Sequence, residues 1–209
     1  MIEVIIMSVY FKDREFTNYV HELLAVPVIY RALNWMVEDI PEEILEQLDI
    51  KKGIDYIAKD IELNIVKIQE RFREQKYQNY NDFTMRYKRD HNINIDRVHS
   101  EFFKIDADFM VYGITNGVKD ELNSNTNFIK YVVVDLKELF KLIDDERIQF
   151  KSSLWKCESQ NGKLIAPIND NHDKSSSFVT FDIQMLHDLF PDKNLIVIQK
   201  GFLIGNTLF

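Results

Sequence analysis

Two short segments carry the residue types that metal-assisted phosphodiester chemistry requires. Asp55 lies in one apolar segment, and the triplet Gln69-Glu70-Arg71 begins about 14 positions later in the next one. Carboxylates hold divalent ions, and a nearby cation stabilises a phosphoryl group. Side chains on adjacent antiparallel strands come within about 5 Å of one another. We therefore expect Asp55, Gln69, Glu70 and Arg71 to be catalytic, with Asp55 and Glu70 as ligands of Mg²⁺.

In a strand, the three residues of this triplet cannot all point to the same face. In residues 65–73 apolar and polar side chains alternate, so Gln69 and Arg71 share the polar face while Glu70 joins the apolar one. Either a bulge turns Glu70 toward the site, or Gln69 supplies a weaker oxygen ligand, or no metal binds well. The alternative without chemistry is that Glu70 pairs with an arginine and Asp55 caps a turn.

A second constellation competes with the first. Asp108 and the segment Asp135-Leu136-Lys137 give an acid followed by an Asp-x-Lys pair after an apolar strand. Asp135 followed three residues later by Glu138 is also a capping box for a helix. The segment FVTFDIQML, with Asp182, repeats the strand–Asp–helix design without a lysine.

The charge distribution bears on binding partners. A net charge of −8 argues against a broad electrostatic hold on nucleic acid. Basic residues nevertheless gather between positions 67 and 90, with tyrosines among them, so local binding of a phosphate backbone is expected; a solvated strand-and-turn face is the alternative. The expected nucleic-acid-binding residues are Arg71, Arg73, Lys76, Arg86 and Lys88.

Periodicity predicts helices first and a sheet afterwards. The expected helices cover 12–26, 28–37 and 41–48, and Pro27 stops or kinks the first. The expected strands cover 54–58, 65–73, 82–88, an extended 101–114 and 195–198, with loops at 89–97, 116–127 and 174–177. YVVVDLKELFKLI and FVTFDIQMLHDLF each predict a strand followed by a helix.

These elements predict one α/β (α+β) domain over residues 1–209. Residues 1–50 form its helical N-terminal part, and residues 51–209 its core, a mixed, mainly antiparallel central sheet flanked by helices. No apolar run is long enough to span a membrane, and no basic leader precedes the first segment. Cys157 is the only cysteine, which suits a reducing, cytoplasmic setting. Neither a zinc-ligand spacing among the histidines nor a phosphate-binding glycine loop is present.

The segments GID, IQER and NDFTMRY resemble the PD-(D/E)xK nuclease-like superfamily, and most of all its small phage and bacterial members. The resemblance covers roughly residues 16–190 and implies a restriction-endonuclease-like fold. It assigns Asp55 as the first metal-binding acid, and it implies that Glu15 or Glu22 of the first helix adds a further carboxylate. Gln69 stands where the family has Asp or Glu, and Arg71 where it has Lys.

Three functions follow from these patterns. The first is a Mg²⁺-dependent endonuclease acting on DNA. The second is a nuclease-like fold without catalysis, such as a phage-type accessory protein that binds nucleic acid or a protein partner. The third is an interaction module that docks a protein through its aromatic surface. The two departures at Gln69 and Arg71, together with the net acidity, favour the second.

Overall fold

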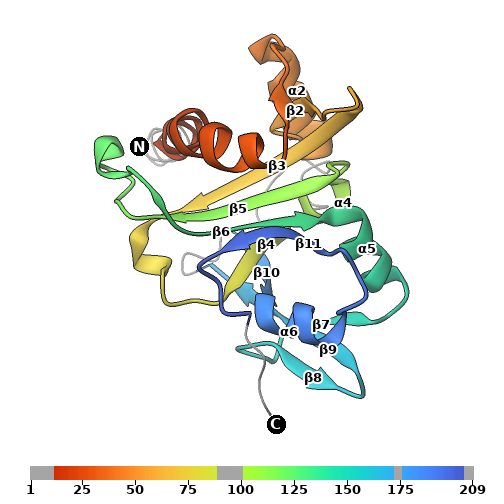
Figure 1. Ribbon diagram of the computed structural model, residues 1–209. Helices are drawn as coiled ribbons and strands as arrows, with labels where there is room; N and C mark the ends of the chain where they lie inside the picture. Colours follow the sequence, from red (N-terminus) through yellow and green to blue (C-terminus); the bar gives the residue numbers. More distant parts are fainter. Residues whose placement is uncertain (1–11, 89–100, 172–175, 205–209) are drawn as a thin grey trace.

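Two sheets packed face to face, with a helix on the outer side of one of them, make up the protein (Figure 1). The computed structural model describes residues 12–88, 101–171 and 176–204. In Figure 1 the N-terminal helix, in red, lies on one side of the larger sheet, and the second sheet lies on the other. The mixed α/β class expected from the sequence is confirmed, although the strands form two sheets instead of one central sheet.

The larger sheet has six strands in the order β1-β2-β3-β5-β6-β11. Their bounds are β1 Met36–Val37, β2 Tyr56–Lys59, β3 Ile65–Arg73, β5 Phe109–Thr115, β6 Phe128–Asp135 and β11 Ile196–Lys200. The neighbours β3 and β5 are parallel, with Arg71 opposite Tyr112, and the other pairs are antiparallel. β3 thus lies between β2, which is short, and β5, which runs along most of its length.

The second sheet has five strands, with the order β4-β10-β9-β7 and β8 paired to β9. Their bounds are β4 Asp82–Lys88, β7 Ile148–Lys151, β8 Glu158–Gln160, β9 Lys163–Asp170 and β10 Ser177–Asp182. Among the described strands of this sheet, β7 and β9 pair in parallel, and the other pairs are antiparallel.

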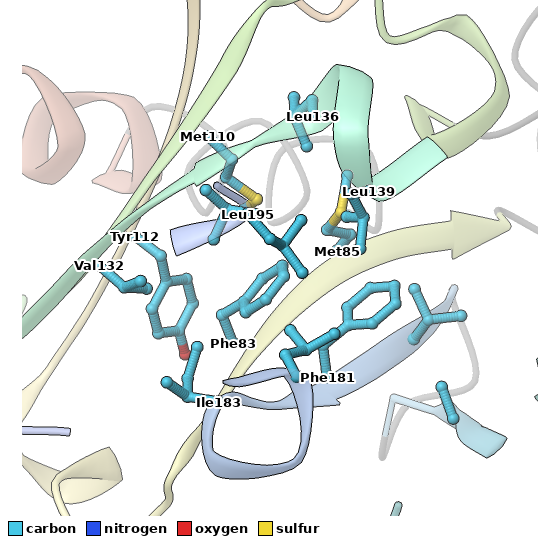
Figure 2. Close-up of a cluster of buried hydrophobic side chains, with 14 of the residues drawn as sticks. Phe83, Met85, Met110, Tyr112, Val132, Leu136, Leu139, Phe181, Ile183 and Leu195 are labelled. Atoms are coloured by element: carbon cyan, nitrogen blue, oxygen red, sulfur yellow. The ribbon is translucent and has the colours of Figure 1, made fainter. Parts of the chain in front are cut away.

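Alternation along the strands creates two hydrophobic cores. On β5, Met110 and Tyr112 point into the core between the sheets, where Figure 2 shows them beside Phe83 and Phe181 of the second sheet. Val111, between them, points to the other side and packs with the N-terminal helix. The same two-residue period therefore serves both layers, which is why β5 is buried along almost its whole length.

The helices are short apart from the N-terminal one. They are α2 Glu42–Lys52, α4 Glu101–Lys104, α5 Leu136–Asp144 and α6 Ile183–Leu189, with 3-10 turns η2 Gln75–Tyr77 and η3 Leu122–Ser124. Asp135 caps α5 by accepting a hydrogen bond from the Glu138 N–H at 3.0 Å, and Asp182 caps α6 in the same way. The repeated strand–Asp–helix design is confirmed. In the described residues no helix is long and apolar enough to cross a membrane.

Three local predictions were wrong. Pro27 does not stop the first helix: residues 12–20 are α-helical, and the chain continues as the wide π-helix η1 His21–Tyr30, which contains Pro27. The wider register has i→i+5 hydrogen bonds, as from the Arg31 N–H to the Val26 oxygen, whereas Pro27 has no N–H to donate in any register. The helix predicted over 28–37 ends at residue 32, and β1 follows.

The third error concerns residues 101–114. They were expected to be extended but begin with the helix α4, whose Phe102 packs in the core between the sheets, and β5 starts at Phe109. The loop predicted over 89–97 lies outside the described residues, as do residues 174 and 175 of the one predicted over 174–177; the last residue of that range, Ser177, begins β10.

Candidate functional site

The ladder between β2 and β3 ends at Asp55, and this fixes the position of that carboxylate. The two strands pair from Lys59↔Ile65 to Tyr56↔Ile68, and the Asp55 N–H still donates to the Ile68 oxygen at 2.9 Å. Beyond this point no strand in the described residues covers this edge of β3. The Asp55 Oδ2 atom accepts a hydrogen bond from the Glu70 N–H at 2.7 Å. Asp55 thus satisfies the first backbone donor that lacks a strand partner.

The turn before β2 aims Asp55 at this edge. Gly53 ends α2 in the left-handed conformation, with φ of 57°, which glycine adopts without steric cost. A Cβ atom at Gly53 would lie 3.0 Å from the Ile105 side chain and 3.5 Å from the Gln69 Oε1 atom. The glycine therefore lets the backbone pass close to the side chain of Gln69.

The alternation of side chains between two faces that was predicted for β3 is observed, and the strand has no bulge. Its even-numbered residues are buried, and its odd-numbered ones are less so. Glu70 consequently points toward the N-terminal helix, where its Oε1 atom lies 3.0 Å from His21 Nδ1 and accepts a hydrogen bond from the Tyr30 hydroxyl at 2.7 Å. The arginine partner that the sequence suggested for Glu70 is thus replaced, in the contacts described, by a histidine and a tyrosine.

Gln69 and Arg71 lie on the opposite face of β3, toward the second sheet. They pair in register with Met110 and Tyr112 of β5, whose side chains enter the core between the sheets. The Oε1 atom of Gln69 is buried and has no hydrogen-bond partner among the described residues. A buried amide oxygen without a partner is costly, so this atom is a candidate acceptor for a bound ligand or ion.

A cleft of about 1030 Å³ lies beside the uncovered edge of β3 and is lined by residues from both faces of that strand. Asp55, Gln69, Glu70 and Arg71 all line it, as does His21 from the helix side. All four residues of the candidate site are therefore neighbours, although Glu70 approaches from the face opposite to Gln69 and Arg71. Glu22 also lines the cleft and is exposed, whereas Glu15 is not among its lining residues.

Four of the five predicted nucleic-acid-binding residues line the cleft, namely Arg71, Arg73, Lys76 and Arg86. The guanidinium of Arg73 lies 3.9 Å from the centre of the Tyr77 ring, a cation–π contact that holds it in place. Lys76 forms an ion pair with Glu74 at the rim. Lys88, the last residue of β4, is not a lining residue.

Burial and negative charge act on the tyrosines around Glu70. Desolvation, followed by the nearby Glu70 carboxylate, raises the pKa of Tyr30 well above its ordinary value. The pKa of Tyr56 is raised by the same two causes, with a further contribution from Asp55. Both phenols therefore keep their protons at physiological pH, and Tyr30 acts as a hydrogen-bond donor to Glu70.

The alternative site, Asp108 with Asp135 and Lys137, makes structural contacts in the described residues. Asp108 accepts a hydrogen bond from the Lys67 N–H at 2.8 Å. It also forms an ion pair with Lys137, whose Nζ atom lies 2.8 Å from the Asp108 Oδ1 atom. Asp135 caps α5, as described above, and Asp108 joins the start of β5 to β3. The N-cap role of Asp135 is confirmed, but the reciprocal bond of a capping box is not made, because the Asp135 N–H donates to the Leu195 oxygen at 2.9 Å.

Among the described residues no group of three or more His, Cys, Asp or Glu side chains is arranged to hold a metal ion. His91, His99 and His172 lie outside those residues. Asp55 and Gln69, whose Oε1 atom has no partner among the described residues, both line the cleft and could offer oxygen ligands to a cation. Comparison with protein-family models, curated proteins and solved structures gives no match to this chain.

Sequence reasoning did not identify the polar partners of Glu70, which are His21 and Tyr30. Both lie on a helix whose spacing to β3 is set only by tertiary packing. One signal was available: a carboxylate on an apolar strand face must find polar partners when it is buried, and His21 is a polar residue on the helix predicted over 12–26.

Proposed function

We propose that this protein binds the phosphate backbone of DNA in the cleft beside β3 and hydrolyses it with Mg²⁺ held by Asp55 and Gln69. In this proposal the chain is a member of the PD-(D/E)xK nuclease-like superfamily with a restriction-endonuclease-like core. One observation carries the proposal. The Asp55 carboxylate and the unpartnered Gln69 Oε1 line the same cleft as Arg71, at the point where β3 loses its strand partner.

The donor set fits a magnesium ion. Mg²⁺ prefers oxygen ligands, keeps several waters, and commonly binds through one or two carboxylates together with substrate phosphates. Asp55 supplies a carboxylate and Gln69 a neutral oxygen, so a phosphate would complete the set. A bound ion of this kind supplies charge stabilisation for a transferring phosphoryl group.

The cations of the cleft have a separate task in this proposal. The planar guanidinium of Arg71 suits two parallel hydrogen bonds to a phosphate group. Arg73, held by Tyr77, and Arg86 of β4 extend the cationic lining beyond it. Because the acids of the cleft offset much of this charge, binding is expected to be local. It should weaken as salt rises, with a slope set by the few phosphates contacted.

A second candidate is binding without hydrolysis, as in an accessory protein in the cytoplasm that holds nucleic acid. The observation that favours it is the orientation of Glu70, whose side chain is engaged by His21 and Tyr30 on the far face of β3. With Glu70 turned away, the proposed metal site has a single carboxylate.

Asp55→Asn separates the two candidates. Asparagine keeps an oxygen that can accept the Glu70 N–H, so the fold is preserved, but it removes the negative charge that attracts a cation. We expect the purified protein to nick plasmid DNA with Mg²⁺ and to lose this activity with EDTA or in Asp55→Asn. Asp108→Asn is the matched control, because Asp108 also accepts a backbone N–H, and it should nick like the wild type.

The outcomes divide cleanly. Binding of DNA measured by fluorescence anisotropy, weakened by Arg71→Ala but without nicking, would support the second candidate. The absence of both binding and nicking would refute both candidates. Nicking that survives in Asp55→Asn would show that the metal is held elsewhere.

A further inference from the structure

A pair of tyrosines lies at the end of the cleft where β3 finishes. The short turn η2 follows β3, and its last residue, Tyr77, lines the cleft. The ring of Tyr80 lies beside the ring of Tyr77, with centroids 6.3 Å apart and planes 42° from parallel. Tyr80 is 57% exposed, so it presents an aromatic ring to solvent next to the lining of the cleft. The function proposed above assigns neither tyrosine a contact with the nucleic acid.

Hydrogen bonds and cations hold this pair in place. The Tyr80 N–H donates to the Tyr77 oxygen at 3.2 Å, and the Tyr80 oxygen accepts a hydrogen bond from Lys130 Nζ of β6 at 2.9 Å. The Arg73 guanidinium lies 3.9 Å from the centre of the Tyr77 ring, and Lys76 Nζ lies 5.4 Å from it. Because the turn is already ordered by these contacts, a ligand that binds there has little conformational entropy to remove.

The charge of the cleft is nearly balanced. Acidic side chains line it in about the same number as basic ones, and several of the two kinds form ion pairs, among them Lys12 with Asp120 and Lys76 with Glu74. Duplex DNA carries one negative charge per about 1.7 Å of its axis, and each strand carries half of these charges. A balanced cleft therefore suits one strand better than two, and part of the affinity must come from contacts other than charge.

The size of the cleft and the exposed tyrosine agree with this preference. A volume of about 1030 Å³ is at the upper end of the range of about 300–1,000 Å³ typical of sites that enclose a small ligand, so it admits a few nucleotides of one chain. The bases of a duplex are paired and stacked on one another, whereas those of a single strand can stack on an aromatic side chain. Such stacking contributes to binding whatever the base, because every base has a π-face.

We propose that the cleft binds a single strand of DNA, with phosphates along Arg71, Arg73 and Arg86 and with one base stacked on Tyr80. The inference rests on the proposed function, because it takes the phosphate backbone as the ligand of the cleft. It adds the form of the nucleic acid and a base contact that requires neither a metal nor hydrolysis. A duplex enters the cleft only where its strands part, so its strands are cut one at a time.

The test compares two forms of the same DNA sequence. A short labelled oligonucleotide without self-complementarity is titrated with the full chain in EDTA, alone and annealed to its complement, and binding is followed by fluorescence anisotropy. One stacked base changes a dissociation constant by a factor of about 5 to about 150. The wild type is expected to bind the single strand more tightly than the duplex by a factor in this range.

Three variants isolate the tyrosine. Tyr80→Ala removes the ring and should lose most of the preference, because single-strand binding weakens while duplex binding is unchanged. Tyr80→Phe keeps the ring and should bind like the wild type. Trp155→Ala is the matched control, since Trp155 is an aromatic residue that is 93% exposed in the turn between β7 and β8 and does not line the cleft. It should also bind like the wild type.

A second measurement reports stacking directly. The fluorescence of 2-aminopurine in the single strand falls when this base stacks, so it should fall on binding to the wild type and to Tyr80→Phe, and fall less on binding to Tyr80→Ala. Equal affinity of the wild type for the two forms of DNA, or an unchanged affinity of Tyr80→Ala for the single strand, would overturn this inference and leave the proposed function standing. Failure of both forms to bind would overturn both.

Discussion

The hydrogen bond from Tyr30 to Glu70 offers a sharp test of how the buried Glu70 carboxylate is held. Tyr30→Phe removes only the hydroxyl group that donates to Glu70 Oε1 at 2.7 Å, at a residue with no exposed surface. The carboxylate then keeps only His21 among its described partners. A hydrogen bond to a charged group contributes about 1.5–3 kcal/mol. For a chain of this size each kcal/mol corresponds to about 2–4 °C, so the expected fall in melting temperature is about 3–12 °C.

The assay is thermal and urea unfolding of the variant beside Tyr56→Phe. The Tyr56 hydroxyl contacts Asn18 Oδ1 at 3.4 Å in an exposed position, so its loss should cost less than about 0.5 kcal/mol. In a Glu70→Gln background the cost of Tyr30→Phe should fall to about 0.5–1.5 kcal/mol, because the bond is then between neutral groups. Equal losses for Tyr30→Phe and Tyr56→Phe, or an unchanged cost in the Glu70→Gln background, would refute the assignment.

Three further predictions concern other residues. Desolvation and the neighbouring Asp182 raise the pKa of Asp82 from 3.8 to about 6, so its ionisation destabilises the fold as pH rises from about 4 through 6. Asp82→Asn should therefore gain up to about 3 kcal/mol in the free energy of unfolding at pH 7 and nothing at pH 3.5, measured by urea unfolding. Asp135→Ala should lose about 1 kcal/mol of stability with its cap, and nicking assays should show no loss of activity. Arg71→Ala should weaken DNA binding in anisotropy titrations more than it lowers the melting temperature; the opposite order would remove Arg71 from the site.

Several elements were predictable because the local sequence pattern matches the packing of the element in the fold. β3 occupies the predicted residues 65–73, since its alternation serves a sheet with a buried face and a polar one. The caps of α5 and α6 were also predictable, because an aspartate after an apolar strand satisfies the N–H groups of the helix that follows.

Other features depend on contacts that one sequence does not display. The strands over 148–170 carry few alternating residues. Their pairing centres on β9, which pairs with β10 on one side and with β7 and β8 along its other part, while β7 and β8 pair with β9 alone in the described residues. The division of the strands into two sheets is likewise a matter of long-range pairing. At the site, the position of Asp55 beside Gln69 followed from strand pairing, but the capture of Glu70 by His21 required the position of a helix about 50 residues earlier in the chain.

The claim on which the function rests is that Asp55 and Gln69 form a cation position in the cleft. Titration of ¹⁵N-labelled protein with Mn²⁺, a paramagnetic substitute for Mg²⁺, tests it directly. We predict that the amide signals of Gly53, Asp55 and Glu70 broaden first, and that Asp55→Asn abolishes this effect. Broadening that centres on Asp108 instead, or that persists unchanged in Asp55→Asn, would contradict the claim.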